Sequence, residues 1–438
     1  MKFSHQFPGA RRGAVLIGWV LRIVVGISGA WTTAYAQEVV RTVAGRALDP
    51  GHVDGPVGRS RFHDPAGLAV DATGNLLVAD SANHCIRRIS LDGAVVTVLG
   101  KPGEPGVADG SVGVARLDTP SAVALGPDGG LYIADTGNHT LRRWLDGRLI
   151  TVAGRAGEAG PTNGPVANAR FNSPLGIVVT PALRILVADS GNHAIRSILP
   201  NGLVETLAGS AQDWGAVDGP AATARFNGPV GLALAPDGVL VVSDTLNHAL
   251  RRVTPDGQVT TLAGRLGEDG CVDGSADVAR FCQPAGLYYH PHGDLYVVDA
   301  FNHLVRKVDA AGVVTTVAGR PAQSGEADGA NGAGRFFNPY GLVVHPDGSI
   351  VVSDTYNATL RQVLPPFRQR LVRQGREAVL QWESVIGLNY QPWIRSSLDP
   401  AWRPLAPSST ANDLVSTVPV VELGRGEAST FFQVRRAD

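Results

Sequence analysis

Short apolar segments alternate with turn residues along most of the chain. In one stretch, strand-like segments at 67–70, 75–80, 86–90 and 95–100 are separated by turn sequences such as "DATG" and "LDG". Apolar, β-branched segments of this length, bounded by Gly, Asp and Asn, are typical of strands and too short for helices. The pattern therefore predicts an all-β protein built of hairpins.

The same four-segment unit occurs six times, with a period of 54 or 55 residues. Each unit opens with a Pro, and the six stand at positions 65, 120, 174, 229, 284 and 339. Four strands per repeat at such a period predict the blades of a β-propeller. A lone fourth-strand sequence, "VVRTVAG" at 39–45, precedes the first unit, and the sixth unit lacks its own. We therefore predict a six-bladed β-propeller with four strands per blade, in which the N-terminal strand closes the last blade.

A polar motif follows the second strand of every unit. It reads D-x-x-N-H-x-[IL]-R and runs from Asp80 to Arg87 in the first unit. The Asp and the Arg recur in all six units, and the His is replaced only once, by Ala358. Because a catalytic group is needed only once, six copies indicate a structural device. We expect the Asp to accept backbone N–H bonds in its turn, while the Arg and His supply partners across the blade.

The long connections between units carry a second repeated pair. Asp54 and Arg61 stand seven residues apart in the first connection, and only the third connection has an Asn, Asn163, in place of the Asp. Repeated Asp residues could indicate repeated Ca²⁺ sites. Because an Arg accompanies each of them, we predict instead an internal ion pair between these two residues, with the Phe that follows as an apolar anchor.

The two motifs together carry a resemblance to a known family. "P-x-G-[LI]" followed by "D-x-x-N-H-x-[IL]-R" resembles the NHL repeat over residues 38–364. The resemblance implies a six-bladed propeller whose repeats build binding surfaces for proteins or other ligands. It also implies an alternative function, because a few relatives are metal-dependent lyases and similar propellers include lactonases.

Function is expected where the units depart from one another. Alternate strands run in opposite directions, so the D-x-x-N-H turns and the long connections share one face, here called the top face, and ligands are expected to bind there. Large apolar residues gather at its variable positions in the last three units, where they predict a patch that stacks on a sugar or grips a peptide. The predicted ligand-binding residues are Trp214, Val230, Leu246, Phe301, Tyr340 and Tyr356. The alternative is that these side chains pack against neighbouring loops.

Enzyme chemistry on this fold would need a metal site. A lactonase-like site needs carboxylates at the channel mouth, and the positions after each opening Pro supply none. A zinc site needs several non-repeated histidines close together. The weak candidates are His290, His292 and His345, in turns on the opposite, bottom face. We therefore predict no cofactor, with Zn²⁺ or Ca²⁺ bound only under the lyase or lactonase alternative.

Residues 1–36 have the features of a signal peptide. Lys2, Arg11 and Arg12 precede an apolar segment, and "AYA" at 34–36 offers a cleavage site. The alternative is a membrane anchor, but the uninterrupted apolar segment is too short to span a bilayer. We predict an exported chain, periplasmic, cell-surface or secreted, with no membrane insertion after cleavage.

The propeller is predicted at 37–364, and residues 365–438 break its pattern after the stiff sequence "LPPF". Short aromatic segments there resemble the small β-sandwich appended to many exported bacterial proteins. The residues that carry this resemblance are Trp382, Tyr390, Trp402 and Phe432. It implies a surface-attachment or glycan-binding module, and the alternative is that the aromatics only fill a small core.

Charge and cysteine content add two expectations. The net charge is −1 and the pI is about 6.8, so no pull toward nucleic acid or membrane is expected. Cys271 and Cys282 bracket one connection, where no other unit has Cys, which predicts a disulfide in an exported protein; the alternative is two unpaired thiols. Cys85 is expected to be a buried free thiol. The sequence thus predicts an exported, non-enzymatic monomer that binds a protein or carbohydrate through its top face.

Overall fold

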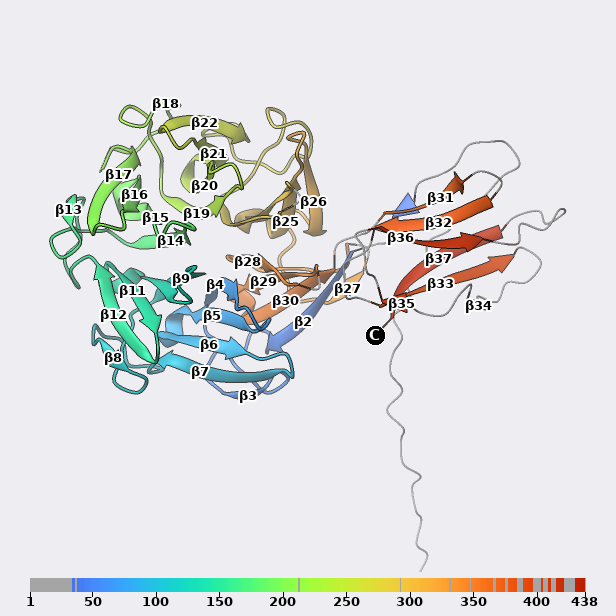
Figure 1. Cartoon of the computed structure of the whole chain (residues 1–438), viewed down its shortest axis with the longest axis horizontal. Helices are drawn as coiled ribbons and strands as arrows, with labels where there is room; N and C mark the ends of the chain where they lie inside the picture. Colours follow the sequence, from blue (N-terminus) through green and yellow to red (C-terminus); the bar gives the residue numbers. More distant parts are fainter. Residues whose placement is uncertain are drawn as a thin grey trace, which may run out of the picture. The chain divides into compact units, whose positions relative to one another are not determined.

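The computed structural model describes residues 38–364, apart from positions 212, 292, 331 and 347, and the strands of a second unit. The chain divides into two compact units, Glu38–Pro365 and the remainder. The first unit is a six-bladed β-propeller in which all strand pairs are antiparallel (Figure 1). This confirms the predicted architecture.

Each blade has four long strands, named here from the channel outward. The inner strands are β4 (Pro65–Val70), β9 (Pro120–Leu125), β14 (Pro174–Val179), β19 (Pro229–Leu234), β23 (Pro284–Tyr289) and β28 (Leu342–Val344). The second strands are β5 (Leu76–Asp80), β10 (Leu131–Asp135), β15 (Ile185–Asp189), β20 (Leu240–Asp244), β24 (Leu295–Asp299) and β29 (Ile350–Asp354). The third strands are β6 (Cys85–Ile89), β11 (Thr140–Leu145), β16 (Ala194–Ile198), β21 (Ala249–Val253), β25 (Leu304–Val308) and β30 (Thr359–Leu364). The outer strands are β7 (Ala94–Gly100), β12 (Arg148–Ala153), β17 (Leu203–Gly209), β22 (Gln258–Ala263), β26 (Val314–Gly319) and β2 (Val39–Gly45).

The long connections add short elements to the blades. Two-residue strands from them pair with the outer strand in five blades: β3 (Gly55–Pro56), β8 (Gly110–Ser111), β13 (Gly164–Pro165), β18 (Gly219–Pro220) and β27 (Gly329–Ala330). A single 3₁₀ turn follows each second strand: η1 (Ser81–Asn83), η2 (Thr136–Asn138), η3 (Ser190–Asn192), η4 (Thr245–Asn247), η5 (Ala300–Asn302) and η6 (Thr355–Asn357).

The N-terminal strand closes the ring. β2 pairs with β30 from Val39 opposite Leu364 to Gly45 opposite Thr359, so the last blade contains both ends of the propeller. The sequence prediction of closure is confirmed.

The core lies between the blades rather than inside one layer. Six apolar clusters are present, one between each pair of neighbouring blades. The second strand of each blade is therefore covered by a neighbouring blade on both faces, which explains why all five residues of β5 are buried. Inner strands converge two residues after the opening Pro, where five blades have Gly and the second has Ala122: a Cβ on Gly176 would lie 2.0 Å from the Val230 carbonyl oxygen of the next blade.

The repeated polar motif forms a buried network that holds the long connection to the blade. The carboxylate of Asp80 is fully buried; its Oδ1 accepts the His63 N–H at 2.8 Å, and its Oδ2 accepts bonds from Asn83 Nδ2 at 2.8 Å and Arg87 Nη1 at 2.7 Å. Burial raises the pKa of this carboxyl above its ordinary value, even though its hydrogen bonds and Arg87 lower it. The motif is structural, as predicted.

The predicted pairing within the long connection is wrong. Arg87, not Arg61, binds Asp54, with Nη2 2.7 Å from Oδ1. Arg61 instead binds Asp49, with 2.8 Å between its Nε and Oδ2. The cause is that Arg87 is fixed inside the blade, where it also lies over the Phe62 ring at 4.9 Å and donates to loop carbonyls. The predicted Phe anchor is confirmed, since Phe62 is fully buried.

The motif His joins neighbouring blades. His84 adopts the left-handed conformation with φ 56°, and its Nδ1 accepts the Thr119 N–H of the next blade at 3.1 Å. The same bond forms from Ser173, Gly228, Gln283 and Asn338 to the four other histidines. Ala358, which replaces the sixth His, has no ring nitrogen to offer at the junction that closes the ring.

All three cysteines are free, so the predicted Cys271–Cys282 disulfide is not formed. Val272 pairs with Arg280 across the connection, and this register places Cys271 and Cys282 one residue out of step with each other. The expectation for Cys85 is confirmed: the thiol is buried, and burial raises its pKa.

The second unit contributes two antiparallel sheets. One contains β1 (Ala34–Tyr35), β31 (Arg368–Gln374), β32 (Glu377–Glu383) and β36 (Val415–Val420). The other contains β33 (Asn389–Ser396), β34 (Arg403–Pro404), β35 (Ser409–Thr410) and β37 (Thr430–Ala437). The β-sandwich stays a prediction, and the expected signal peptide lies outside the described residues except for β1. Within the described part of the chain, no helix has the length and apolar character needed to cross a bilayer.

Candidate functional site

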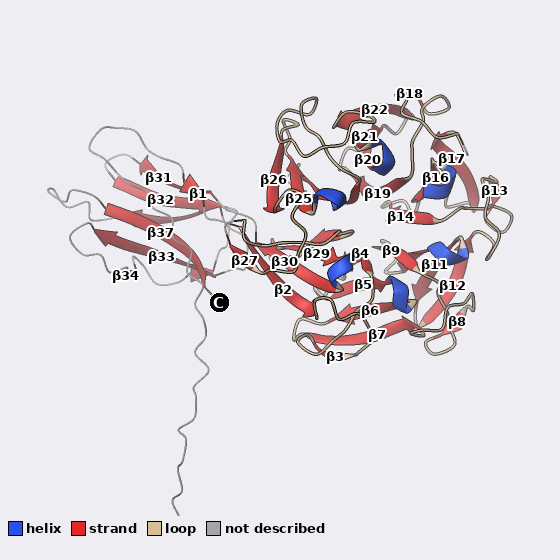
Figure 2. Cartoon of the chain, turned by 180° about the vertical axis from the view of Figure 1, so that it is seen from behind, coloured by secondary structure: helices blue, strands red, loops and turns tan. Residues whose placement is uncertain are grey.

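The six 3₁₀ turns form a ring on the top face of the propeller (Figure 2). Each turn is tied to a long connection: Asn83 Nδ2, at the end of η1, donates to the Gly51 carbonyl at 2.9 Å, and the equivalent bond recurs in every blade. The predicted sharing of one face by turns and connections is confirmed. The network makes this face a fixed platform, because the Asn of each turn is also bonded to the buried Asp.

Four of the six predicted ligand-binding residues are exposed on this platform. Leu246, Phe301 and Tyr356 are the middle residues of η4, η5 and η6, and their exposed fractions are 47, 51 and 54%. Trp214 is 65% exposed, and its loop lies against η4, since Asn247 Nδ2 donates to the Gly215 carbonyl at 2.7 Å. We name these four residues, Trp214, Leu246, Phe301 and Tyr356, the top-face arc.

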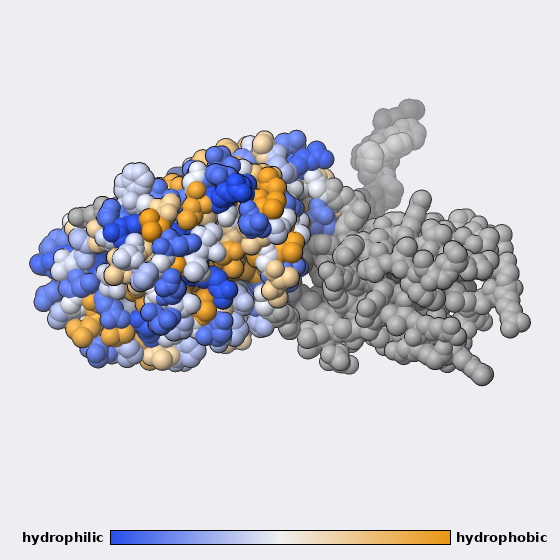
Figure 3. Space-filling model, turned by 90° about the horizontal axis from the view of Figure 1, so that it is seen from above, coloured by the Kyte–Doolittle hydropathy of each residue, from blue (hydrophilic) through white to orange (hydrophobic). Residues whose placement is uncertain are grey.

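The arc is confined to three neighbouring blades. The equivalent positions of η1, η2 and η3 hold Ala82, Gly137 and Gly191, which leave that half of the ring without large side chains. In the side view of Figure 3, hydrophilic and hydrophobic residues are interspersed over the rim. The arc is therefore a local departure from a mixed surface.

Phe337 belongs beside the arc and was missed by the sequence interpretation. Its ring meets Tyr356 edge-on at 5.2 Å and His303 edge-on at 5.9 Å between centroids. The signal was present, because the position after the buried Phe of each connection is polar or Cys in the other five units. Comparing that position would have added Phe337 to the patch.

Val230 and Tyr340 are not on the exposed patch, and this part of the prediction is wrong. Both directly follow an opening Pro, and this position faces the central channel rather than the top surface. Val230 is only 9% exposed and belongs to a core cluster, against which Tyr340 packs.

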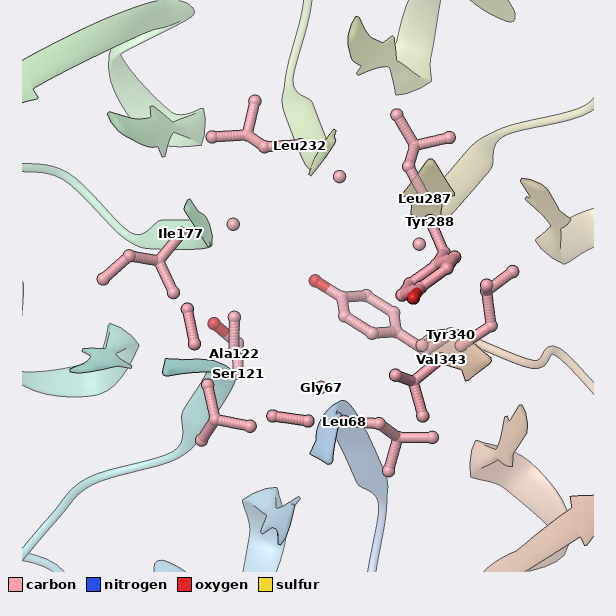
Figure 4. A pocket seen from close by; sticks show the side chains of 18 of the residues that line it. Gly67, Leu68, Ser121, Ala122, Ile177, Leu232, Leu287, Tyr288, Tyr340 and Val343 are labelled. Atoms are coloured by element: carbon pink, nitrogen blue, oxygen red, sulfur yellow. The ribbon is translucent and has the colours of Figure 1, made fainter. Parts of the chain in front are cut away.

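The central channel holds a cavity of about 320 Å³ lined by residues of all six inner-strand segments (Figure 4). Apart from backbone groups, its lining offers three polar groups, the hydroxyls of Ser121, Tyr288 and Tyr340. No acidic, basic or His residue is among the residues that line it. Burial raises the pKa of both tyrosines, so their hydroxyls are neutral hydrogen-bond donors near neutral pH.

Of the three weak metal candidates, the structure describes His290 and His345. His290 follows β23 and meets Tyr296 edge-on, with 6.4 Å between ring centroids. His345 follows β28, and its Nε2 lies 3.1 Å from the Gly74 carbonyl oxygen of the next blade. His292 lies outside the described residues. Among the residues that are described, no group of three or more His, Cys, Asp or Glu side chains could hold a metal ion.

Sequence similarity to known proteins is found in the blades. The NHL repeat family matches residues 62–89, 117–144, 171–196 and 281–308, each of which covers the second strand and the polar motif of one blade. Four of the six blades therefore match the NHL repeat. The chain is 32% identical over 282 residues to the protein SUPPRESSOR OF QUENCHING 1, chloroplastic, of Arabidopsis thaliana, covering 60% of this chain and 27% of that one. It is 29% identical over 297 residues to NHL repeat-containing protein 2 of Homo sapiens, covering 60% of this chain and 41% of that one. The chain thus spans less than half of either relative.

Solved structures share the fold of this propeller. An auxiliary nutrient binding protein from Bacteroides thetaiotaomicron superimposes with a TM-score of 0.58 at 17% identity, covering 75% of this chain and 76% of that one. At this identity the likeness concerns the fold alone.

Proposed function

We propose that this chain is an exported, non-enzymatic binding protein that holds a partner protein through the top-face arc. The observation that carries the proposal is the run of half-exposed Leu246, Phe301 and Tyr356 on three successive turns of a fixed platform. Aromatic side chains of this kind dominate the binding energy of protein interfaces. No cofactor is required, and the binding unit is a monomer.

A protein is preferred to a carbohydrate because of the composition of the arc. Leu246 offers an aliphatic contact without a flat face for a sugar ring, whereas extended peptides use spaced apolar anchors. Charged residues border the arc: Asp213 precedes Trp214, and the exposed pair Arg265 and Glu268 lies in the loop whose Gly267 N–H donates to the Asn247 carbonyl at 2.9 Å. An apolar centre with a polar rim is the usual anatomy of a protein interface.

Export is supported by the predicted signal peptide at residues 1–36. The location is periplasmic, cell-surface or secreted. The mature N-terminus, determined by mass spectrometry of protein recovered from the native host, is expected at Gln37. A chain that retains residues 1–36 would contradict this part of the proposal.

The arc is tested with peptides selected from a random phage-displayed library against the full chain. Their affinities are then measured by calorimetry for the wild type and for Phe301→Ala and Tyr356→Ala. Each substitution is expected to weaken binding at least about fivefold, because a hot-spot aromatic contributes more than about 1 kcal/mol. The matched control is Leu91→Ala, since Leu91 is 71% exposed in the β6–β7 turn of the bottom face.

Two outcomes would overturn the proposal. Equal peptide affinity in the wild type and both arc variants would show that the arc is not the binding surface. Glycan-array binding that is lost in the same two variants, without any selectable peptide, would replace the protein partner by a carbohydrate.

A further inference from the structure

Tyr340 lies across the upper end of the central channel. It occupies the position after the opening Pro, where the other five blades have Ala66, Ser121, Leu175, Val230 and Ala285. Its ring and Leu175 both pack against the cluster that contains Val230 and Ala285, so side chains from four consecutive blades meet there. Figure 4 shows the Tyr340 ring pointing into the middle of the channel.

The sixth blade is modified at the residues that carry Tyr340. Its inner strand begins at Leu342, whereas in the other five blades the opening Pro itself pairs with the motif Asp. In those five blades the carbonyl of the opening Pro also accepts a bond from a Ser or Thr hydroxyl of the preceding turn; before Pro339 that residue is Ala300. The segment that places Tyr340 therefore lacks two contacts that every other blade has, whereas the Tyr340 N–H itself donates to the Ser353 carbonyl at 3.0 Å.

The cavity extends from Tyr340 away from the top face. Its lining follows the inner strands to Val70, Leu125 and Val344, the last residues of β4, β9 and β28. Its volume of about 320 Å³ falls within the range of small-molecule sites. An apolar cavity of about 150 Å³ in another protein is large enough to hold benzene.

One polar atom in this cavity has no protein partner. The Tyr340 Oη is buried, and no hydrogen-bond partner for it is found among the described residues. A buried hydroxyl left without a partner is destabilising. The Ser121 hydroxyl, by contrast, is engaged, because it donates to the Leu175 carbonyl at 2.9 Å. Tyr340 therefore presents the donor that a bound molecule would meet.

We propose that the channel is a second binding site, independent of the top-face arc, for a small, neutral and largely apolar molecule with one hydrogen-bond acceptor. Such a molecule enters from the bottom face and accepts a bond from Tyr340 Oη. Neutrality follows from the lining, which contains no charged side chain to balance an ion. The acceptor follows from the buried Tyr340 hydroxyl at the upper end, for which no partner is found among the described residues.

The test uses two probes of nearly equal shape, acetophenone, which has a carbonyl acceptor, and ethylbenzene, which has none. Their affinities for the full chain are measured by saturation-transfer NMR titration. The wild type is expected to prefer acetophenone about fivefold to tenfold, the worth of one neutral hydrogen bond. Tyr340→Phe removes only the hydroxyl and is expected to abolish this preference while leaving ethylbenzene binding unchanged.

Two controls separate this site from the other features of the chain. Tyr296→Phe removes a partly buried hydroxyl that is not among the cavity-lining residues and is expected to keep the preference. Phe301→Ala on the top-face arc is also expected to keep it. The proposal is overturned if the wild type binds neither probe, or if Tyr340→Phe still prefers acetophenone to the same degree.

Discussion

The third blade contains a natural defect that a single substitution should repair. In the first blade, the Asp54 carboxylate accepts bonds from Arg87 Nη2 at 2.7 Å and from the N–H of Thr97 at 3.0 Å. In the third blade Asn163 takes the place of the Asp; its Oδ1 accepts a bond from Arg196 Nη2 at 2.6 Å. An amide nitrogen cannot accept a bond from a backbone N–H, so Asn163 offers one acceptor atom where Asp offers two.

Asn163→Asp should therefore stabilise the propeller. The Arg196 guanidinium, already charged in its bond to the Asn163 amide, gains an ionised partner, and the Thr206 N–H gains an acceptor, a hydrogen bond worth about 1 kcal/mol. The equivalent Asp side chains are 42 to 51% exposed, and water screens part of the gain. We expect an increase in the free energy of unfolding of about 1 kcal/mol. Asp218→Asn, which creates the same defect in the fourth blade, should cost about as much.

The assay is urea unfolding of the full chain followed by circular dichroism, with wild type, Asn163→Asp and Asp218→Asn compared. Hydrogen exchange gives a local measurement, because the amide of Thr206, the counterpart of Thr97, should exchange more slowly in Asn163→Asp. A neutral or destabilising Asn163→Asp, beside a costly Asp218→Asn, would refute the reasoning. It would mean that the third blade has adapted to the amide by other contacts.

Three further predictions concern packing, pH and redox state. Gly176→Ala should destabilise the chain by more than about 3 kcal/mol, because its Cβ would strike the carbonyl of the next blade, whereas Gly58→Ala, with nothing within 4 Å, should have little effect in the same urea assay. Burial lowers the pKa of His193, and its neutral Nδ1 accepts the Gly228 N–H at 3.1 Å. The contribution of this residue to the stability of the fold is therefore present above pH 6.5, the ordinary pKa, and is lost as the pH falls through the lower pKa of the folded state. His193→Asn keeps an acceptor that does not titrate, so the drop in urea midpoint between pH 7.5 and pH 5 should be smaller than in the wild type; an equal drop would contradict the assignment. The three free thiols should all react with Ellman's reagent in the unfolded, unreduced chain, and a count of one would restore the disulfide.

The fold was predictable because the same four-strand unit occurs six times in the sequence. A blade that occurs six times shows in sequence which residues are structural, and the lone strand at 39–45 specifies how the ring closes. The exposure of Leu246, Phe301 and Tyr356 was also predictable, since their position in the motif faces away from the buried Asp. The place of a residue in a repeated motif shows where it lies on the turn, because the same turn occurs in every blade.

The remaining errors have one physical cause, which is that spacing along the chain does not say which side chain lies nearest in space. Asp54 has Arg61 seven residues away, yet it binds Arg87, 33 residues away. Tyr340 follows an opening Pro as predicted. Its position in the sequence does not show whether the side chain there points to the top surface or into the central channel. The Tyr340 hydroxyl, for which no partner is found among the described residues, lies where side chains of four blades meet, and no single repeat contains that arrangement.

The pairing of β2 with β30 also determines when the ring can be completed during synthesis. Residues 39–45 leave the ribosome among the first of the propeller, and their partners at 359–364 are the last. More than 300 residues separate the paired strands, so the seam is a contact of very long range whose loop-closure entropy must be overcome in one step. Until then the sixth blade has no outer strand, and the edge of β30 is open to any strand that meets it. Under the proposed export this order is an advantage, because the closed ring cannot form while either end of the chain is still in transit.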